Sequence, residues 1–317
     1  HNDACYPALL VIGQFIDALK SGKYDLQHTA LLITQTGGGC RASNYIYLLR
    51  KALNKCGYGD IPVISASFMK SEQSGGFSLP VTMLLQALYG VLCGDLIMTL
   101  YNQCIPYEIH KGDSQKAVDD SVAMAEKLFC KKLLRWKAVS ELMVNIIKRF
   151  MQVERSGEKK IKVGIVGEIL VKYMPLANNH LVELLEREGA EAVVPDLLDF
   201  FAATIYEQDY KHTHLGKGWT ASTVAKVGVP ALQRMRRPAI EALKASKRFD
   251  APQPIGHIAD LAKPFLSIGN QYGEGWFLAG EMAELITSGT PNIVCIQPFA
   301  CLPNHVVGKG VIKALRA

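Results

Sequence analysis

Three of the eight cysteines stand directly before predicted helices, where a thiol can become a metal ligand. Cys40 and Cys301 lie in loops that follow short apolar strands, and Cys5 precedes the first amphipathic segment. A helix N-terminus lowers the pKa of a thiol, and its free N–H groups can face an anionic ligand. The three positions therefore suggest a shared metal or cluster site, although their spacing matches no compact motif such as CxxC.

The loop before Cys40 is rich in glycine, which allows the backbone to approach a bulky inorganic ligand closely. We expect Gly38, Gly39 and Arg41 to line such a cofactor. The run lacks the lysine of a phosphate-binding P-loop and does not follow the GxGxxG pattern of dinucleotide sites. The glycines near residue 165 have the wrong spacing for that pattern too, which argues against a nicotinamide cofactor.

The other cysteines have simpler interpretations. Cys295 falls inside the last predicted strand, where we prefer a core position to a ligand position. The remaining four lie within or at the ends of helical segments and behave as small hydrophobic residues: Cys56, Cys93, Cys104 and Cys130.

Several polar residues are weaker candidates. Glu168 follows a strand and is a candidate acid/base group without a visible partner, and His305 is better explained as a surface or capping residue. The segment 270–276 is either a pocket lining or a plain strand-to-helix loop. The basic run 234–237 is usually a solvated helix face, the alternative being contact with the phosphates of coenzyme A.

The bulk composition describes a compact globular protein. The chain has 317 residues, of which 49% are hydrophobic and 20% charged, with a net charge of +6. That charge is too small to indicate nucleic acid. Free thiols and the lack of a signal peptide suggest the cytoplasm. Asp95 interrupts the apolar stretch 79–101, which predicts a core helix and no membrane span. The start at His1 and the end inside a helical pattern suggest a fragment of a longer polypeptide.

The predicted elements alternate between strands and helices. Strands at 29–34 and 62–65 flank a helix at 42–56. These three elements form a βαβ unit with a parallel sheet. Residues 79–152 are helical throughout, with a break at 105–107, and form a helical layer or cap.

A second set of alternating elements follows a polar hinge at 154–160. The predicted strands are 162–166, 192–195, 264–268 and 293–297, and the predicted helices are 178–188, 220–246, 275–288 and 304 onward. We therefore expect an α/β fold of two doubly wound, flavodoxin- or Rossmann-like parallel-sheet domains. They would cover residues 1–155, with the helical cap, and 156–317, truncated at its C-terminal end.

Three motifs together resemble a known family. They are NDACYPA at residues 2–8, TGGGCRASNY at 36–45 and QPFACLPNH at 297–305. The chain resembles, over nearly its whole length, the dehydratase-like part of acyl-CoA dehydratase activase-related proteins. These are similar to the cluster-bearing D-component of 2-hydroxyglutaryl-CoA dehydratase.

The resemblance implies an oxygen-sensitive [4Fe–4S] cluster held by Cys5, Cys40 and Cys301. Its fourth ligand position is open to water or substrate, or to a bridging sulfide in double-cubane relatives. An ATP-dependent activase supplies a strongly reducing electron, and a 2-hydroxyacyl-CoA loses water through a ketyl radical. Double-cubane relatives reduce small molecules instead. The resemblance also allows a dimer.

Two alternatives remain open at this point. The chain could be a non-catalytic module that holds a cluster and transfers electrons to a partner. It could also be an α/β ligand-binding domain whose cysteines are structural thiols. Iron content separates the last alternative from the other two, and binding of acyl-CoA separates an enzyme from an electron-transfer module. Three thiolates leave one iron of a [4Fe–4S] cluster open to a substrate, whereas four thiolates would suit outer-sphere electron transfer only. Ligation by Cys295 would therefore decide between these two functions.

Overall fold

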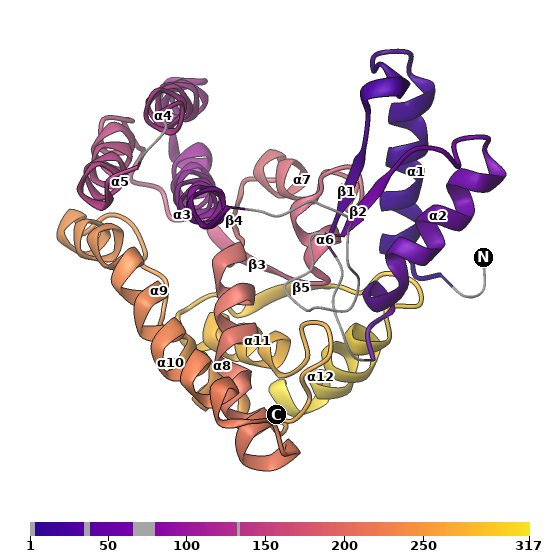
Figure 1. Ribbon diagram of the computed structural model, residues 1–317. Helices are drawn as coiled ribbons and strands as arrows, with labels where there is room; N and C mark the ends of the chain where they lie inside the picture. Colours follow the sequence, from indigo (N-terminus) through magenta and orange to yellow (C-terminus); the bar gives the residue numbers. More distant parts are fainter. Residues whose placement is uncertain (1–3, 35–38, 66–79, 132–133) are drawn as a thin grey trace.

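The computed structural model describes residues 4–34, 39–65, 80–131 and 134–317, and it is an α/β protein with two small parallel sheets among many helices (Figure 1). The strands are β1 (Leu31–Ile33), β2 (Val63–Ser65), β3 (Ile161–Gly167), β4 (Ala190–Val193) and β5 (Asn292–Ile296). The α-helices are α1 (Tyr6–Lys20), α2 (Tyr45–Lys55), α3 (Val81–Cys104), α4 (Asp113–Phe129), α5 (Trp136–Met151), α6 (Ile169–Tyr173), α7 (Leu181–Arg187), α8 (Leu197–Leu215), α9 (Trp219–Ser246), α10 (Ile255–Ala262), α11 (Trp276–Thr287) and α12 (Gly310–Leu315).

The N-terminal unit contains the strand–helix–strand arrangement expected from the sequence. Strands β1 and β2 pair in parallel, with Leu31 opposite Val63. A short 3₁₀ helix, η2 (Arg41–Asn44), leads from the Cys40 loop into α2. The apolar faces of α1 and α2 meet the strands in one core cluster that includes Leu19, Ile33 and Leu49. This packing places the first residues of α1 and of η2 at the same end of the unit.

The second sheet has the order β4-β3-β5, with all strands parallel. Because the chain runs from the central strand β3 to β4 and later returns to β5 on the other side, the strand order reverses between β3 and β5. Open α/β sheets bind ligands at such a reversal, beyond the carboxyl ends of the strands. Gly167 ends β3 with φ +133°, and a Cβ there would lie 2.1 Å from the Ile296 carbonyl oxygen, so only glycine fits between the strands.

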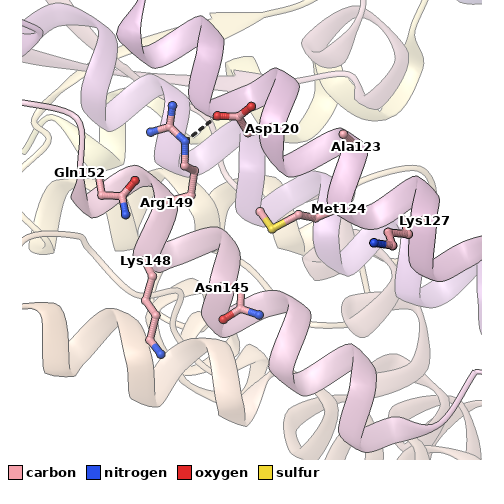
Figure 2. Close-up of a pocket in the computed structure, with 8 residues that line it drawn as sticks. All are labelled: Asp120, Ala123, Met124, Lys127, Asn145, Lys148, Arg149 and Gln152. Carbon is pink, nitrogen blue, oxygen red and sulfur yellow. Dashed lines mark hydrogen bonds and ion pairs between the residues drawn. The ribbon is translucent and has the colours of Figure 1, made fainter.

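The helices α4 and α5 pack beside α3 and leave a shallow hollow between them (Figure 2). The hollow has a volume of about 450 Å³, and Arg149 Nε lies 2.7 Å from Asp120 Oδ2 across it. None of the residues proposed as ligands lines it. We therefore treat it as a surface feature of the helical layer.

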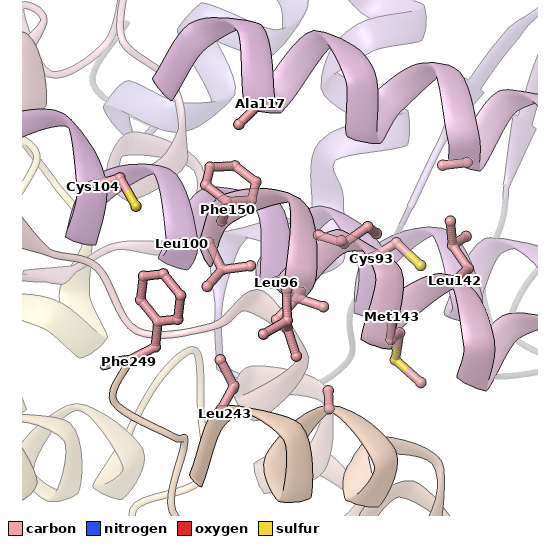
Figure 3. Close-up of a cluster of buried hydrophobic side chains, with 14 of the residues drawn as sticks. Cys93, Leu96, Leu100, Cys104, Ala117, Leu142, Met143, Phe150, Leu243 and Phe249 are labelled. Atoms are coloured by element: carbon pink, nitrogen blue, oxygen red, sulfur yellow. The ribbon is translucent and has the colours of Figure 1, made fainter. Parts of the chain in front are cut away.

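The helical layer α3–α5 packs against helix α9 from the second half of the chain (Figure 3). Leu100 and Phe150 from the layer share a buried cluster with Leu243 and Phe249. The side chain of Asp95 on α3 also accepts hydrogen bonds from the first backbone N–H groups of α8, at Leu197 and Leu198. The contacts of the layer thus extend across residue 155, and the domain boundary expected there stays a prediction.

Helix α3 lies in a segment that is long and apolar enough to cross a membrane. An 18-residue window of the segment Val81–Tyr107 has a mean hydropathy of 1.7, and 22% of that window is buried. Its C-terminal half is packed in the core, where Asp95, Asn102 and Gln103 are buried, whereas Val81 and Met83 at its start are exposed. Buried polar groups at those positions fit a packed helix of a globular protein.

Some predicted elements differ from the structure. Residues 264–268 were expected to form a strand, but they form turns after α10, and Phe265 and Leu266 pack into neighbouring cores. The helix expected from residue 304 begins with a π-helical segment, η4 (Asn304–Lys309), before α12. The sheets have two and three strands within the described residues, fewer than two doubly wound domains would contain.

Candidate metal centre at three helix-entry loops

The Cys5 and Cys301 loops meet beyond the carboxyl end of β5. The backbone N–H of Tyr6, the first residue of α1, donates to the Phe299 carbonyl oxygen at 3.0 Å. Ala300, in the left-handed region with φ 57°, packs against a small buried cluster that contains Cys5. Cys5 and Cys301 are 4% and 8% exposed, so both thiols lie inside the protein at this junction.

Tyr45 joins the Cys5 loop to the Cys40 loop. Its hydroxyl lies 3.2 Å from Cys5 Sγ, and its residue begins α2, directly after η2. Burial raises the pKa of the Tyr45 hydroxyl far above its ordinary value, and the hydrogen bond with Cys5 raises it further. Tyr45 therefore stays protonated and can donate its proton to the Cys5 sulfur.

The loop before α11 lies against both the Cys40 loop and the Cys301 loop. A Cβ on Gly39 would lie 3.3 Å from the Tyr272 ring, and a Cβ on Gly273 would lie 2.9 Å from the Pro303 side chain. Tyr272 and Gly273 thus touch the Cys40 loop and the Cys301 loop respectively. Gly275 has φ +51°, and a Cβ there would meet the Asn270 carbonyl oxygen at 2.0 Å, so this tight turn requires glycine.

Two buried carboxyl groups face the same region. Glu168 caps α6 after β3 and accepts from the Val171 backbone N–H at 2.9 Å. Glu274 Oε1 accepts from the Ile169 backbone N–H at 2.8 Å, which ties the loop before α11 to the end of β3. Burial and then the charge of Glu274 raise the pKa of Glu168 to about 7. Burial also raises the pKa of Glu274.

The thiols of Cys40 and Cys301 are poorly ionised without a ligand. Burial, together with the charges of Glu274 and Glu168, raises the pKa of Cys301 to about 12. Burial likewise raises the pKa of Cys40, with further contributions from Glu274, Cys5 and Glu168. These mutual electrostatic contributions place the three cysteines and the two carboxyl groups in one neighbourhood. A bound metal would be needed to hold the buried sulfurs as thiolates.

Asn304 supplies the hydrogen-bond donors closest to Cys301. Its Nδ2 lies 3.2 Å from Cys301 Sγ and 2.6 Å from Glu274 Oε2. Its backbone N–H also donates to the Cys301 sulfur, and both bonds lower the pKa of that thiol against the effect of burial. Asn304 is completely buried, and its Oδ1 has no hydrogen-bond partner among the described residues.

The three cysteines are not arranged to share a single metal ion. Within the part of the chain that the structure describes, no three His, Cys, Asp or Glu side chains are grouped closely enough to share one ion. A single zinc ion needs all its ligands about 2.0–2.3 Å from one point. A cubane instead binds each thiolate to a different iron, and it accepts hydrogen bonds at its sulfurs. Cys5, Cys40 and Cys301, with the amide of Asn304, are groups of that kind.

The other predicted site residues are placed as follows. Gly39 and Arg41 are exposed beside Cys40, and Gly38 lies outside the described residues. Cys295 Sγ accepts from Gln297 Nε2 at 3.5 Å and packs against the core cluster beneath α11. Cys295 is half-buried there, and its core role stays a prediction. On the basic helix α9, Arg236 is buried in ion pairs with Asp196 and Asp199, whereas Arg234 and Arg237 are exposed.

Three side chains near the thiols were not singled out from the sequence: Tyr45, Glu274 and Asn304. Tyr45 and Asn304 belong to the cysteine motifs, and Glu274 belongs to the glycine-rich loop at 270–276. Their motifs marked the right segments. Which side chain in each motif faces the sulfurs depends on tertiary contacts, such as Tyr45 with Cys5 across 40 residues and Asn304 with Glu274 across 30, which spacing alone does not reveal.

A second hollow lies at the opposite end of the sheet, near the start of β3. It has a volume of about 560 Å³, and its lining includes Arg155, Lys160 and Lys162. Lys160 pairs with Glu158 at 2.6 Å, and Lys162 pairs with Asp250 at 2.7 Å. These ion pairs neutralise much of the basic character of the hollow.

Comparisons with protein-family models, with curated proteins and with solved structures found no match to this chain.

Proposed function

We propose that the chain is an iron–sulfur protein of the 2-hydroxyacyl-CoA dehydratase type, in which Cys5, Cys40 and Cys301 hold a [4Fe–4S] cluster. The observation that carries the proposal is the convergence of the three cysteine loops beyond the carboxyl ends of β3 and β5. The hydrogen bond from Tyr6 to Phe299 and the contact of Tyr45 with Cys5 tie these loops together.

The position in the fold supports the same proposal. Glu168 and the Cys301 loop follow β3 and β5, the two strands between which the strand order reverses. That is where open α/β sheets take their ligands. We extend the proposal to the architecture: each half would be a doubly wound unit, with the N-terminal sheet around β1 and β2 and the second around β3.

The chain's own residues would have distinct tasks at this site. The three thiols would hold the cluster, the hydroxyl of Tyr45 would donate to the Cys5 sulfur, and Glu168 would hold a proton near neutral pH. When bound, the cluster would supply a low-potential electron and an open iron position for an acyl-CoA thioester or a small reducible molecule. The proposed partner is an ATP-dependent activase in the cytoplasm.

The test is the content of iron and acid-labile sulfide per chain after oxygen-free reconstitution, together with an EPR spectrum of the dithionite-reduced protein. We expect about four irons and four sulfides per chain and a reducible cubane signal. Iron at background level after reconstitution would overturn the proposal and leave a metal-free α/β ligand-binding domain.

Titration with acyl-CoA then addresses catalysis. Perturbation of the cluster spectrum by a 2-hydroxyacyl-CoA, but not by free coenzyme A, would support a dehydratase. A loaded cluster with an unchanged spectrum at saturating acyl-CoA would favour a non-catalytic electron-transfer module.

A further inference from the structure

We propose that Asn304 is a positioning residue that hydrogen-bonds the Cys301 sulfur and thereby raises the reduction potential of the cluster held on it. This inference rests on the proposed function. It concerns a residue that the resemblance does not assign, and it follows from three observations on the described residues.

The first observation is the orientation of the amide. Asn304 Nδ2 donates to Glu274 Oε2 at 2.6 Å, which is the orientation that an ionised Glu274 requires, because a carboxylate oxygen only accepts hydrogen bonds. The same NH₂ lies 3.2 Å from Cys301 Sγ. Because the NH₂ has two protons, one amide can serve both acceptors. Glu274 therefore fixes the donor in the orientation that the sulfur needs.

The second observation is the local charge. Glu168 and Glu274 are buried beside the thiols and act against negative charge on Cys301. A reduced cluster carries one more negative charge than an oxidised one, so these carboxyl groups disfavour reduction whenever they are ionised. The two N–H groups of Asn304 act in the opposite direction, because a donor stabilises the more negative state.

The third observation is rigidity. Asn304 is completely buried at the first position of the π-helical segment η4. A Cβ on Gly308, one turn later, would lie 2.9 Å from both Gln297 Nε2 and Leu278 Cδ2, so this segment sits tightly on β5 and α11. A donor held this firmly loses little freedom when it bonds to a cluster ligand, which is how outer groups tune metal sites.

The experiment measures the midpoint potential of the reconstituted cluster by EPR-monitored redox titration. Asn304→Leu removes the side-chain donor at similar size, and Asn304→Ser keeps a shorter hydroxyl donor. His305→Leu is the matched control, because His305 is the next residue but its side chain is exposed. The midpoint potential does not depend on the fraction of chains that carry a cluster, so it can also be measured in a variant with incomplete iron content.

We expect the equilibrium constant for reduction to fall by about tenfold in Asn304→Leu, which is about 59 mV for a one-electron couple. The midpoint potential of Asn304→Ser should lie between those of Asn304→Leu and the wild type, and that of His305→Leu should equal the wild-type value. A wild-type potential, or a higher one, in Asn304→Leu would overturn the inference and leave Asn304 as a structural link to Glu274. Absence of a cluster from the wild-type protein would instead overturn the proposed function, and the iron and sulfide analysis would show this before any potential is measured.

Discussion

Cys5, Cys40 and Cys301 differ in the groups that lie beside each sulfur. Cys5 meets the hydroxyl of Tyr45, and Cys301 meets the amide and backbone N–H of Asn304. The Cys40 sulfur accepts the backbone N–H of Ala42, and this bond lowers the pKa of Cys40 against the larger effect of burial. Each ligand candidate thus has a hydrogen-bond donor beside it. In the helical layer, Cys104 lies 3.9 Å from Arg248 Nη2, whereas Cys93 is buried in the apolar core of α3 and α5.

The first prediction compares a candidate ligand with a core cysteine. Cys301→Ala should abolish the cluster while the far-UV circular dichroism of the protein stays unchanged. Cys93→Ala should keep the iron content, because Cys93 is buried in the hydrophobic core formed by α3 and α5, away from the three loops. It should lower the free energy of unfolding by only about 1 kcal/mol, through a small cavity. Retention of full iron and sulfide by Cys301→Ala would contradict the three-cysteine site.

At the scale of elements, local patterns predicted most helices and strands, because each carries its own periodicity and end signals. The helices α9 and α11 lie within a residue or two of the predicted ranges. The strand expected at 264–268 was wrong, because a short apolar run after a proline has the composition of both a buried strand and a buried turn. Phe265 and Leu266 are apolar there because they fill two cores.

The candidate site was predictable to the level of its loops, and no further. Cysteine type, glycine content and position before a helix identified Cys5, Cys40 and Cys301, and the structure brings their loops together. The partnership of Asn304 with Glu274 joins two loops that are 30 residues apart. The cap that Asp95 provides for α8 joins elements more than 100 residues apart. Such contacts depend on the tertiary fold and leave no local signal.

The packing of α10 on α11 gives the second prediction at this scale. These helices touch at Gly280, where a Cβ would lie 2.7 Å from both Ile258 Cγ2 and the Ile258 carbonyl oxygen. Gly280→Ala should therefore lower the free energy of unfolding by roughly 1–3 kcal/mol, because backbone atoms must move. The measurement is urea denaturation of the apoprotein.

The matched control for Gly280 is Gly94, which lies in helix α3. A Cβ at Gly94 would meet nothing within 4 Å. Gly94→Ala should raise the free energy of unfolding by about 0.5–1 kcal/mol, because alanine restricts the unfolded chain and favours the helix. Equal effects of the two substitutions would show that the contact of α10 with α11 is looser than described.

For the whole molecule, the notable feature is the number of carboxyl groups inside it. Burial raises the pKa of Asp95 to about 8 and of Glu168, Glu186 and Glu281 to about 7. The charge of Asp196 contributes to the shift of the Asp95 pKa. Lys172, which lies 2.9 Å from Glu281, opposes the shift of Glu281. In the unfolded chain all four groups ionise near their ordinary pKa of about 4.

The last prediction follows from that difference. Between pH 5 and 8 the folded protein keeps protons that the unfolded chain has already released, so the free energy of unfolding must fall as pH rises. We expect a loss on the order of 2–4 kcal/mol between pH 5.5 and 8, measured by urea denaturation of the apoprotein with EDTA and reductant. Glu168→Gln removes one of the groups and should make the decline shallower. Stability that is flat or rising over this interval would mean that these carboxyl groups are ionised in the folded protein, and Glu168 could then not hold a proton beside the cysteines at neutral pH.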